Sequence, residues 1–440
     1  MLNNLSAELV VLIFNLLDDS SFLAFRGVSR RLCRASYDLF ARRWFALVTT
    51  DFTPRSLRRL CHIARNPEIA SRVRCLQIAR WDRFSNPPKS SLDLPDDDDD
   101  DDDDDEPDGI RELWPRCESG CLDLHSRQAS GLRDVLLRFA RCTAICIIDG
   151  ADEERWSEPP PDRLQLNPVD MFWFMLSLLK QDGGLQVQRF DVQFETGPVE
   201  NANGWPSSPE LSQLLNRSSW ASHLRQLSIS WDFRGCLVNI VLPLITTAAH
   251  LESLTLHHCS VNGDVKAFLT GLADAPQLPA LSRLKLAGGK QVSPTVLPAF
   301  IARFQPTLEE LWIQNVAVVG GTVGDVLRRL AACDWPALRR ITVNACYRVY
   351  FCPRLLFRHH QGVERSGGGG FEVTLFSHRW KSRVKGVRYR GHGDDMRLAL
   401  SALGESAYTV YPQNPEPDTP SMDSYSSAGN QTWRVVRDLV

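Results

Sequence analysis

Residues 251–256, with the sequence LESLTL, carry the L-x-x-L-x-L pattern that decides the fold of this chain. The pattern occurs five times, and the starts of successive copies are separated by 27, 30, 27 and 30 residues. A unit of this length holds one strand and one helix, and it buries its apolar side chains only by stacking on its neighbours. The pattern therefore predicts an α/β stack of repeated units. The copies begin at Leu224, Leu251, Leu281, Leu308 and Leu338.

The residues around these copies extend the same organisation. Capped helical stretches follow three of the copies, at residues 262–273, 293–304 and 322–332. Fainter copies of the pattern begin earlier in the chain, at Val73, Cys142 and Val187. Strands that alternate with helices at this period are the format of leucine-rich repeats. We therefore expect a leucine-rich-repeat-like α/β solenoid, curved into a partial horseshoe whose concave side is lined by the strands.

The first 45 residues form a separate helical module. Apolar residues recur at helical spacing in three successive stretches, 9–17, 22–32 and 37–45, and therefore predict three short helices. A core of this size is too small to stand alone without a staple or a partner. Cys33 is the only cysteine of the module, so no disulfide within the module can supply that staple. We expect the module to complete its core against the helices of another protein.

The same module contains, in this order, Leu5-x-x-Glu8-Leu9, Ile13, Leu16-Leu17-Asp18, Phe22-Leu23, Val28-Ser29-Arg30-Arg31-Leu32 and Leu39-Phe40. This order of residues resembles the F-box family. Ser6 stands where the family usually has Pro, and Ser is itself a good helix N-cap. The remainder of the chain resembles the leucine-rich-repeat-like body of fungal F-box proteins.

This resemblance implies a function. In the family, the motif docks on a Skp-type adaptor and so attaches the protein to a cullin ubiquitin ligase, whose catalysis belongs to other subunits. The chain would then recognise the substrate, with no catalytic residue and no cofactor of its own. An alternative is a leucine-rich-repeat interaction scaffold with no ubiquitin role, in which the helical module caps the solenoid. The residues implied to bury at the adaptor, or in the small core beside it, are Leu5, Leu9, Ile13, Leu16, Leu17, Leu23, Val28 and Leu32.

A protein substrate would bind on the strands of the repeat region. Side chains alternate between the two faces of a strand, so residues between the buried leucines point away from the core. These positions are expected to form the substrate face, although the sequence does not identify the substrate. The candidate substrate-binding residues are Arg283, Lys285, Glu310, Trp312 and Arg340.

The predicted domain boundaries follow changes in composition. Residues 1–48 form the F-box-like module, and residues 49–82 form a connecting helix and a first repeat-like strand. Residues 83–115 are rich in Pro, Ser and Asp and are predicted to be a disordered acidic insertion. Residues 116–410 form the leucine-rich-repeat-like domain, in which strands after residue 345 make an atypical cap. Residues 411–440 are predicted to be mostly disordered.

Charge narrows the class of partner. The net charge is −3, and eleven acidic residues at 96–106 leave a balance of +8 on the rest of the chain. That balance is modest for 440 residues, so no nucleic-acid partner is expected. The acidic run is predicted to be solvated, with attraction of a basic partner as the alternative. The basic segment 378–390 is predicted to be a solvated edge strand, with base stacking as the alternative.

Targeting signals are not expected. The longest apolar run, at residues 171–179, is too short to span a membrane, and acidic residues interrupt the apolar stretch at the start of the chain. The twelve cysteines are dispersed and lack the density of a secreted disulfide scaffold. We therefore expect a cytoplasmic or nuclear protein without membrane association.

Metal binding and enzymatic activity are not expected either. Cys117, Cys121, Cys142 and Cys146 form two C-x3-C pairs, whereas structural zinc usually uses tighter C-x2-C knuckles. A buried cysteine on a strand behaves as a small hydrophobe. No P-loop, serine-hydrolase, zinc-protease or kinase motif occurs. His257 follows a repeat strand and is expected to pack in a turn.

Overall fold

The computed structural model is that of an α/β protein with parallel strands. The chain divides into two compact units, which consist mainly of Met1–Leu179 and of Val187–Gln431. The structure describes residues 6–79, 114–117, 122–148, 168–179, 185–193, 211–212, 215–216, 219–231, 238–258, 265–288, 292–344, 347–348, 354–357, 374–377, 384–390 and 394–410.

The first unit begins with four short helices, which we call the head. They are α1 (Ala7–Leu16), α2 (Asp19–Gly27), α3 (Arg30–Ala35) and α4 (Tyr37–Phe45). Ser6 caps α1, because its hydroxyl accepts the Leu9 amide at 3.4 Å. The prediction of three helices is wrong, since α2 and α3 divide the second stretch. The break arises at Ser29, whose side chain caps α3 by accepting the Leu32 amide at 3.2 Å.

The head has an aromatic core of its own. Phe14 of α1 and Phe22 of α2 are fully buried, and their ring centres lie 4.5 Å apart. Arg43 of α4 fixes α1 and α2 from outside this core. Its guanidinium donates to the Leu17 carbonyl at 3.0 Å and pairs with Asp19 at 2.6 Å. These contacts hold α1 in one orientation, with a defined face toward the core.

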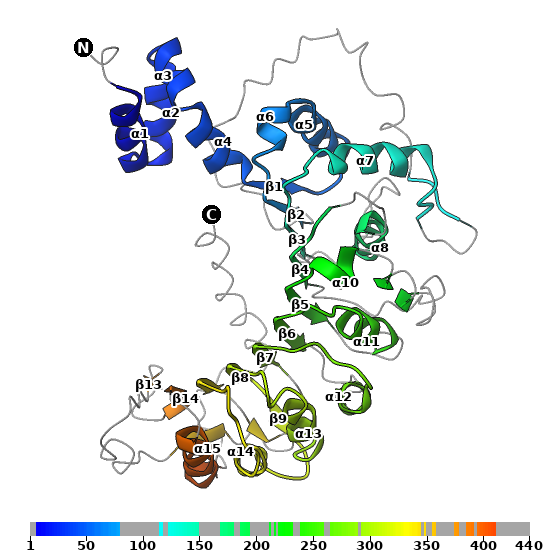
Figure 1. Ribbon diagram of the computed structural model, residues 1–440, viewed down its shortest axis with the longest axis vertical. Coiled ribbons are helices and arrows are strands. Elements are labelled where there is room, and N and C mark those ends of the chain that lie inside the picture. Colours follow the sequence, from blue (N-terminus) through cyan, green and yellow to red (C-terminus); the bar gives the residue numbers. More distant parts are fainter. Residues whose placement is uncertain are drawn as a thin grey trace, which may run out of the picture. The chain divides into compact units, whose positions relative to one another are not determined.

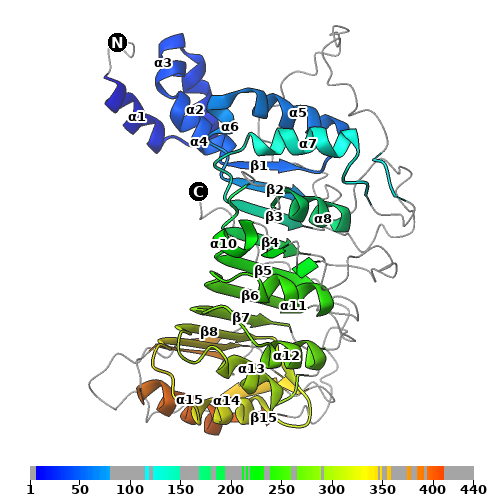
Figure 2. The same ribbon diagram turned by 45° about the vertical axis from the view of Figure 1, so that its right-hand side comes forward.

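The rest of the first unit is a small parallel sheet with its helices. Strands β1 (Leu47–Thr50), β2 (Cys75–Ala79) and β3 (Ala144–Ile148) pair in register. Helix α5 (Pro54–Arg65) follows β1, and α7 (Arg127–Leu137) lies beside it (Figure 2). The unit also contains α6 (Pro67–Ala70) and α8 (Pro168–Leu179). Helix α5 confirms the connecting helix that was predicted within residues 49–82. Strands β2 and β3 lie in the fainter copies that begin at Val73 and Cys142, whereas β1 was not predicted.

One predicted boundary in this unit is wrong. Trp114 falls within the segment 83–115 that was predicted to be disordered, yet it is buried. The neighbouring Arg116 pairs with Asp170 of α8 at 2.7 Å, and this carboxylate is itself buried. An aromatic anchor and a buried ion pair therefore hold the end of this segment on the fold. The acidic run 96–106 lies outside the described residues.

The second unit contains six parallel strands in sequence order. They are β4 (Arg189–Gln193), β5 (Gln226–Trp231), β6 (Ser253–His258), β7 (Arg283–Ala287), β8 (Glu310–Gln314) and β10 (Arg340–Asn344). The helices between them are α10 (Ser219–His223), α11 (Val238–Thr246), α12 (Val265–Asp274), α13 (Val296–Ala302) and α14 (Val323–Ala331). All five predicted strands and the three predicted helices of the regular copies are confirmed.

The leucine pattern explains this arrangement. In the middle copy, Leu281, Leu284 and Leu286 are all buried, and the same is true of the equivalent residues in the other copies. Figure 1 shows α11, α12 and α13 on one side of strands β6 to β8. The apolar residues therefore pack between the strands and their helices, while the alternate residues occupy the opposite face of the sheet.

The end of the second unit departs from the parallel pattern. Strand β14 (Val384–Arg390) pairs antiparallel with β10 on one side and with β13 (Thr374–Ser377) on the other. A second small sheet contains β9 (Ala317–Val318), β11 (Tyr347–Arg348), β12 (Arg354–Phe357) and β15 (Ala407–Val410). Residues 384–390 of the basic segment therefore form an inner strand of the sheet, and the prediction of an edge strand is wrong. Residues 378–383 lie outside the described residues.

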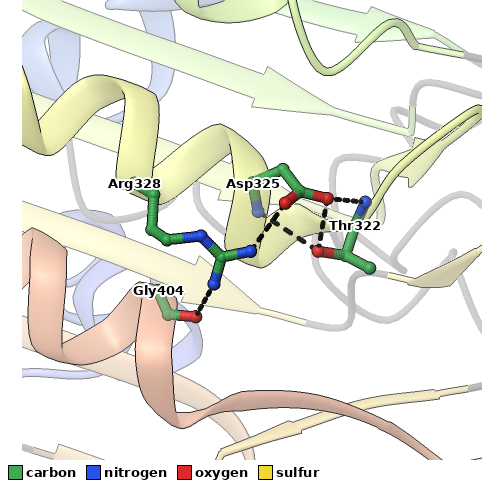
Figure 3. Close-up of polar contacts among 4 residues, drawn as sticks. All are labelled: Thr322, Asp325, Arg328 and Gly404. Carbon is green, nitrogen blue, oxygen red and sulfur yellow. Dashed lines mark hydrogen bonds and ion pairs between the residues drawn. The ribbon is translucent and has the colours of Figure 1, made fainter.

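Helix α15 (Asp394–Ser406) closes this end by packing on α14 (Figure 1). Figure 3 shows the polar tie between the two helices. Thr322 and Asp325 form a capping box at the start of α14, and Arg328 bonds both to Asp325 at 2.6 Å and to the Gly404 carbonyl at 3.0 Å. Gly404 allows this approach, because a Cβ there would lie 2.9 Å from the Arg328 side chain and 3.2 Å from the Gly324 carbonyl oxygen.

Replacing Arg328 by Ala is expected to loosen α15 without unfolding the strands. The variant loses a charged hydrogen bond to a helix carbonyl, which at this partly exposed position contributes roughly 1 kcal/mol. Amide hydrogen exchange in residues 394–406 should then be about fivefold faster. Arg329→Ala is the matched control, because Arg329 is an exposed arginine on the same helix. Equal effects of the two substitutions would contradict the role of the Gly404 contact.

Candidate functional site

A stripe of exposed leucines lies on helix α1. Leu9, Leu12 and Leu16 are exposed by 49%, 59% and 87%, and their spacing places them on one face of the helix. The opposite face of α1 is buried, since Val10 and Phe14 belong to the core of the head. We call these three leucines the α1 stripe. Val28, exposed by 62%, is a further apolar side chain on the surface of the head.

The stripe is unusual for the surface of this molecule. Among the described residues, five large hydrophobic side chains are strongly exposed, and four of them belong to the head. The fifth is Leu398, which stands on α15 in the second unit. Exposed apolar side chains that gather on one helix face favour docking of that face into an apolar groove. Full burial of a leucine contributes about 1.5–3 kcal/mol.

The residues predicted to bind an adaptor separate into two groups. Leu9, Leu16 and Val28 are exposed, whereas Leu32 is buried in the core of the head. Ile13 is half-buried, and Leu17 and Leu23 pack partly buried against the core. Leu5 lies outside the described residues. Leu12 was missed, although its spacing of three from Leu9 and four from Leu16 places it in the same stripe.

A second candidate surface is the strand face that the helices leave uncovered. One row of residues in register runs across four strands of this face. It contains Thr255 of β6, Lys285 of β7, Trp312 of β8 and Thr342 of β10. A parallel row on the same face contains Arg283, Glu310 and Arg340. We call the face that bears these two rows, together with the row of Ser230 and His257, the polar sheet face.

The predicted substrate residues meet in pairs on this face. Glu310 and Arg340 form an ion pair at 2.7 Å, although they are thirty residues apart. The Lys285 ammonium lies 5.5 Å from the centre of the Trp312 ring. Arg283 is exposed at the start of its strand. The register of β7, β8 and β10 therefore places all five candidates on one face, and four of them contact one another in two pairs.

Burial changes the acid–base properties of this face. Desolvation lowers the pKa of Lys285. The pKa of His257 is also lowered, mainly by its burial and to a smaller extent by the positive charge of Lys285. Burial raises the pKa of Asp191, against the opposing effect of its partner Arg189 at 2.7 Å. The positive forms of Lys285 and His257 are thus both disfavoured.

His257 was placed in a turn by sequence reasoning, and this prediction is wrong. The residue belongs to β6, and its Nδ1 lies 3.2 Å from the Ser230 hydroxyl of the neighbouring strand. Ser230 and His257 occupy equivalent positions in consecutive copies, so the spacing of 27 residues could have identified the pair.

The cysteines that were considered as zinc ligands differ in their exposure to solvent. Cys117 is exposed, Cys146 is partly buried, and Cys142 is buried. Burial raises the pKa of the Cys142 thiol to about 12, and its sulfur contacts the Ala144 carbonyl at 3.4 Å. Within the described ranges, no group of three or more His, Cys, Asp and Glu side chains could hold a metal ion. Cys121 lies outside those ranges.

Alkylation of the native protein by iodoacetamide at pH 8 should separate these thiols. Cys117 is expected to react at least tenfold faster than Cys142, because only an accessible thiolate is nucleophilic. Peptide mass spectrometry over a time course measures both rates, and the same reaction in urea provides the control in which both react. Rapid modification of Cys142 in the native protein would contradict its burial.

Comparison with models of known protein families gives no match, and comparison with curated proteins gives none either. Within the described part of the chain, no helix combines the length and the apolar character needed to cross a membrane.

Proposed function

We propose that this chain is the substrate-recognition subunit of a Skp–cullin–F-box ubiquitin ligase. The head acts as an F-box and binds a Skp-type adaptor through the α1 stripe and Val28. The second unit is a leucine-rich-repeat-like solenoid that binds a protein substrate on its polar sheet face. The chain itself carries out no catalysis and needs no cofactor, and it works in the cytoplasm, the nucleus or both.

The observation that carries this proposal is the contrast within helix α1. One face of the helix belongs to a closed aromatic core, and the other presents Leu9, Leu12 and Leu16 to solvent. A head stabilised only by packing on the rest of its own chain has no need of these leucines. Their exposure supports a partner with an apolar groove, and the resemblance of the sequence to the F-box favours a Skp-type adaptor as that partner.

Co-expression of the full chain with a Skp-type adaptor tests the proposal. The expected result is a stoichiometric complex that survives gel filtration and recruits a cullin. The alternative function, an interaction scaffold with no ubiquitin role, predicts that the chain elutes alone. Absence of a complex at micromolar concentrations of both proteins would therefore overturn the proposal.

A further inference from the structure

Lys285 is a half-buried cation on the polar sheet face. Its ammonium lies over the Trp312 ring, and among the described residues it has no carboxylate partner. The nearest acidic strand position is Glu310, and this carboxylate already pairs with Arg340 at 2.7 Å. Desolvation without a counter-ion is unfavourable, which agrees with the lowered pKa of Lys285.

The surroundings of Lys285 also favour a negative ligand. On the exposed-face positions of β7, β8 and β10, three cations, Arg283, Lys285 and Arg340, accompany the single carboxylate of Glu310. The face thus holds an excess of positive charge beside the aromatic ring of Trp312.

We infer that this part of the polar sheet face, centred on Lys285 and Trp312, binds an acidic peptide segment of the partner protein, with a carboxylate placed on the Lys285 ammonium. The inference rests on the proposed role of this face in substrate binding, and it specifies that the bound segment of the substrate is acidic. The carboxylate supplies the counter-ion that the protein itself does not provide. The Trp312 ring packs against the aliphatic part of the same segment.

An acidic peptide fits this face better than a nucleic acid does. Phosphate backbones need a row of unpaired cations, and the aromatic residue of such a site stacks on a base. Here Arg340 already pairs with Glu310, and Arg189 pairs with Asp191, so the face does not offer a row of unpaired cations. A single central lysine flanked by paired charges suits one or two carboxylates at fixed positions.

Fluorescence anisotropy with the full chain tests this inference. The probes are a labelled twelve-residue peptide rich in Asp and Glu and its counterpart with Asn and Gln at every acidic position. The acidic peptide should bind at least tenfold more tightly than the amide peptide, and added salt should weaken it. Lys285→Met should lower the affinity for the acidic peptide at least tenfold, while Lys285→Arg should retain most of it.

Lys266→Met is the matched control, because Lys266 is an exposed lysine on α12 and lies outside the polar sheet face. Equal binding of the two peptides, or unchanged affinity of Lys285→Met, would overturn the inference. So would tighter binding of a labelled single-stranded RNA that Lys285→Met abolishes. Adaptor binding is measured on the same wild-type preparation. A chain that binds the adaptor but not the acidic peptide refutes only this inference, and the reverse result refutes only the adaptor role.

Discussion

Replacement of both Leu12 and Leu16 by Asp is expected to abolish co-purification of the chain with a Skp-type adaptor. Both side chains are strongly exposed in the free chain, so the substitutions leave the core of the head intact. In the complex, each substitution removes a buried leucine and places a charge in an apolar groove. The affinity should fall at least about 100-fold, or roughly 3 kcal/mol.

Leu398→Asp is the control for this experiment. Leu398 is exposed by 62%, which is close to the value for Leu12, but it stands on α15 in the other unit. This variant should retain full adaptor binding, and far-UV circular dichroism should show unchanged helix content in all variants. If the double variant still co-purifies with the adaptor, the α1 stripe is not the docking surface.

The second large effect is expected from Trp335→Ala. Trp335 is almost fully buried after α14, and its indole nitrogen donates to the Leu330 carbonyl at 2.7 Å. The substitution leaves a cavity and removes this hydrogen bond, so the second unit should lose about 3–5 kcal/mol of stability. Urea denaturation followed by circular dichroism should show a clearly lower midpoint.

Trp312→Ala tests whether this loss depends on burial. Trp312 is only partly buried on the polar sheet face, so its truncation should cost less than half as much. Similar shifts of the two midpoints would mean that the second unit does not depend on the core between its strands and helices.

The regular part of the fold could be predicted because its signal is repeated. Each copy must bury the same leucines, so the spacing from Leu224 to Leu338 fixes the strands and their register. Local caps were predictable for a similar reason, as with Ser6 and Thr53, whose side chains accept amides of the first helical turn. Such features depend on a few neighbouring residues.

Features that depend on distant partners were missed. Strand β1 has only four residues, and its pairing with β2 is decided by the sheet. The basic strand β14 carries no leucine pattern, and its inner position depends on pairing with both β10 and β13. Helix α15 is held partly by Arg328, which lies 76 residues before Gly404. Tertiary context decides each of these elements.

The candidate surfaces show the same division. The candidate substrate-binding residues could be predicted because side chains alternate between the two faces of a strand. The pairing of Glu310 with Arg340 follows from their equivalent positions in successive copies. Helical spacing alone could not separate Leu32, which is buried, from Leu16, which is exposed. That distinction depends on how α1 and α3 pack within the head.

Hydrogen exchange of the full chain, with and without a Skp-type adaptor, tests the central claim most directly. The account predicts that the adaptor slows amide exchange within residues 7–28, which include α1 and Val28, and leaves the polar sheet face unchanged. Exchange that stays the same throughout the head at saturating adaptor, or slowing confined to the second unit, would contradict it.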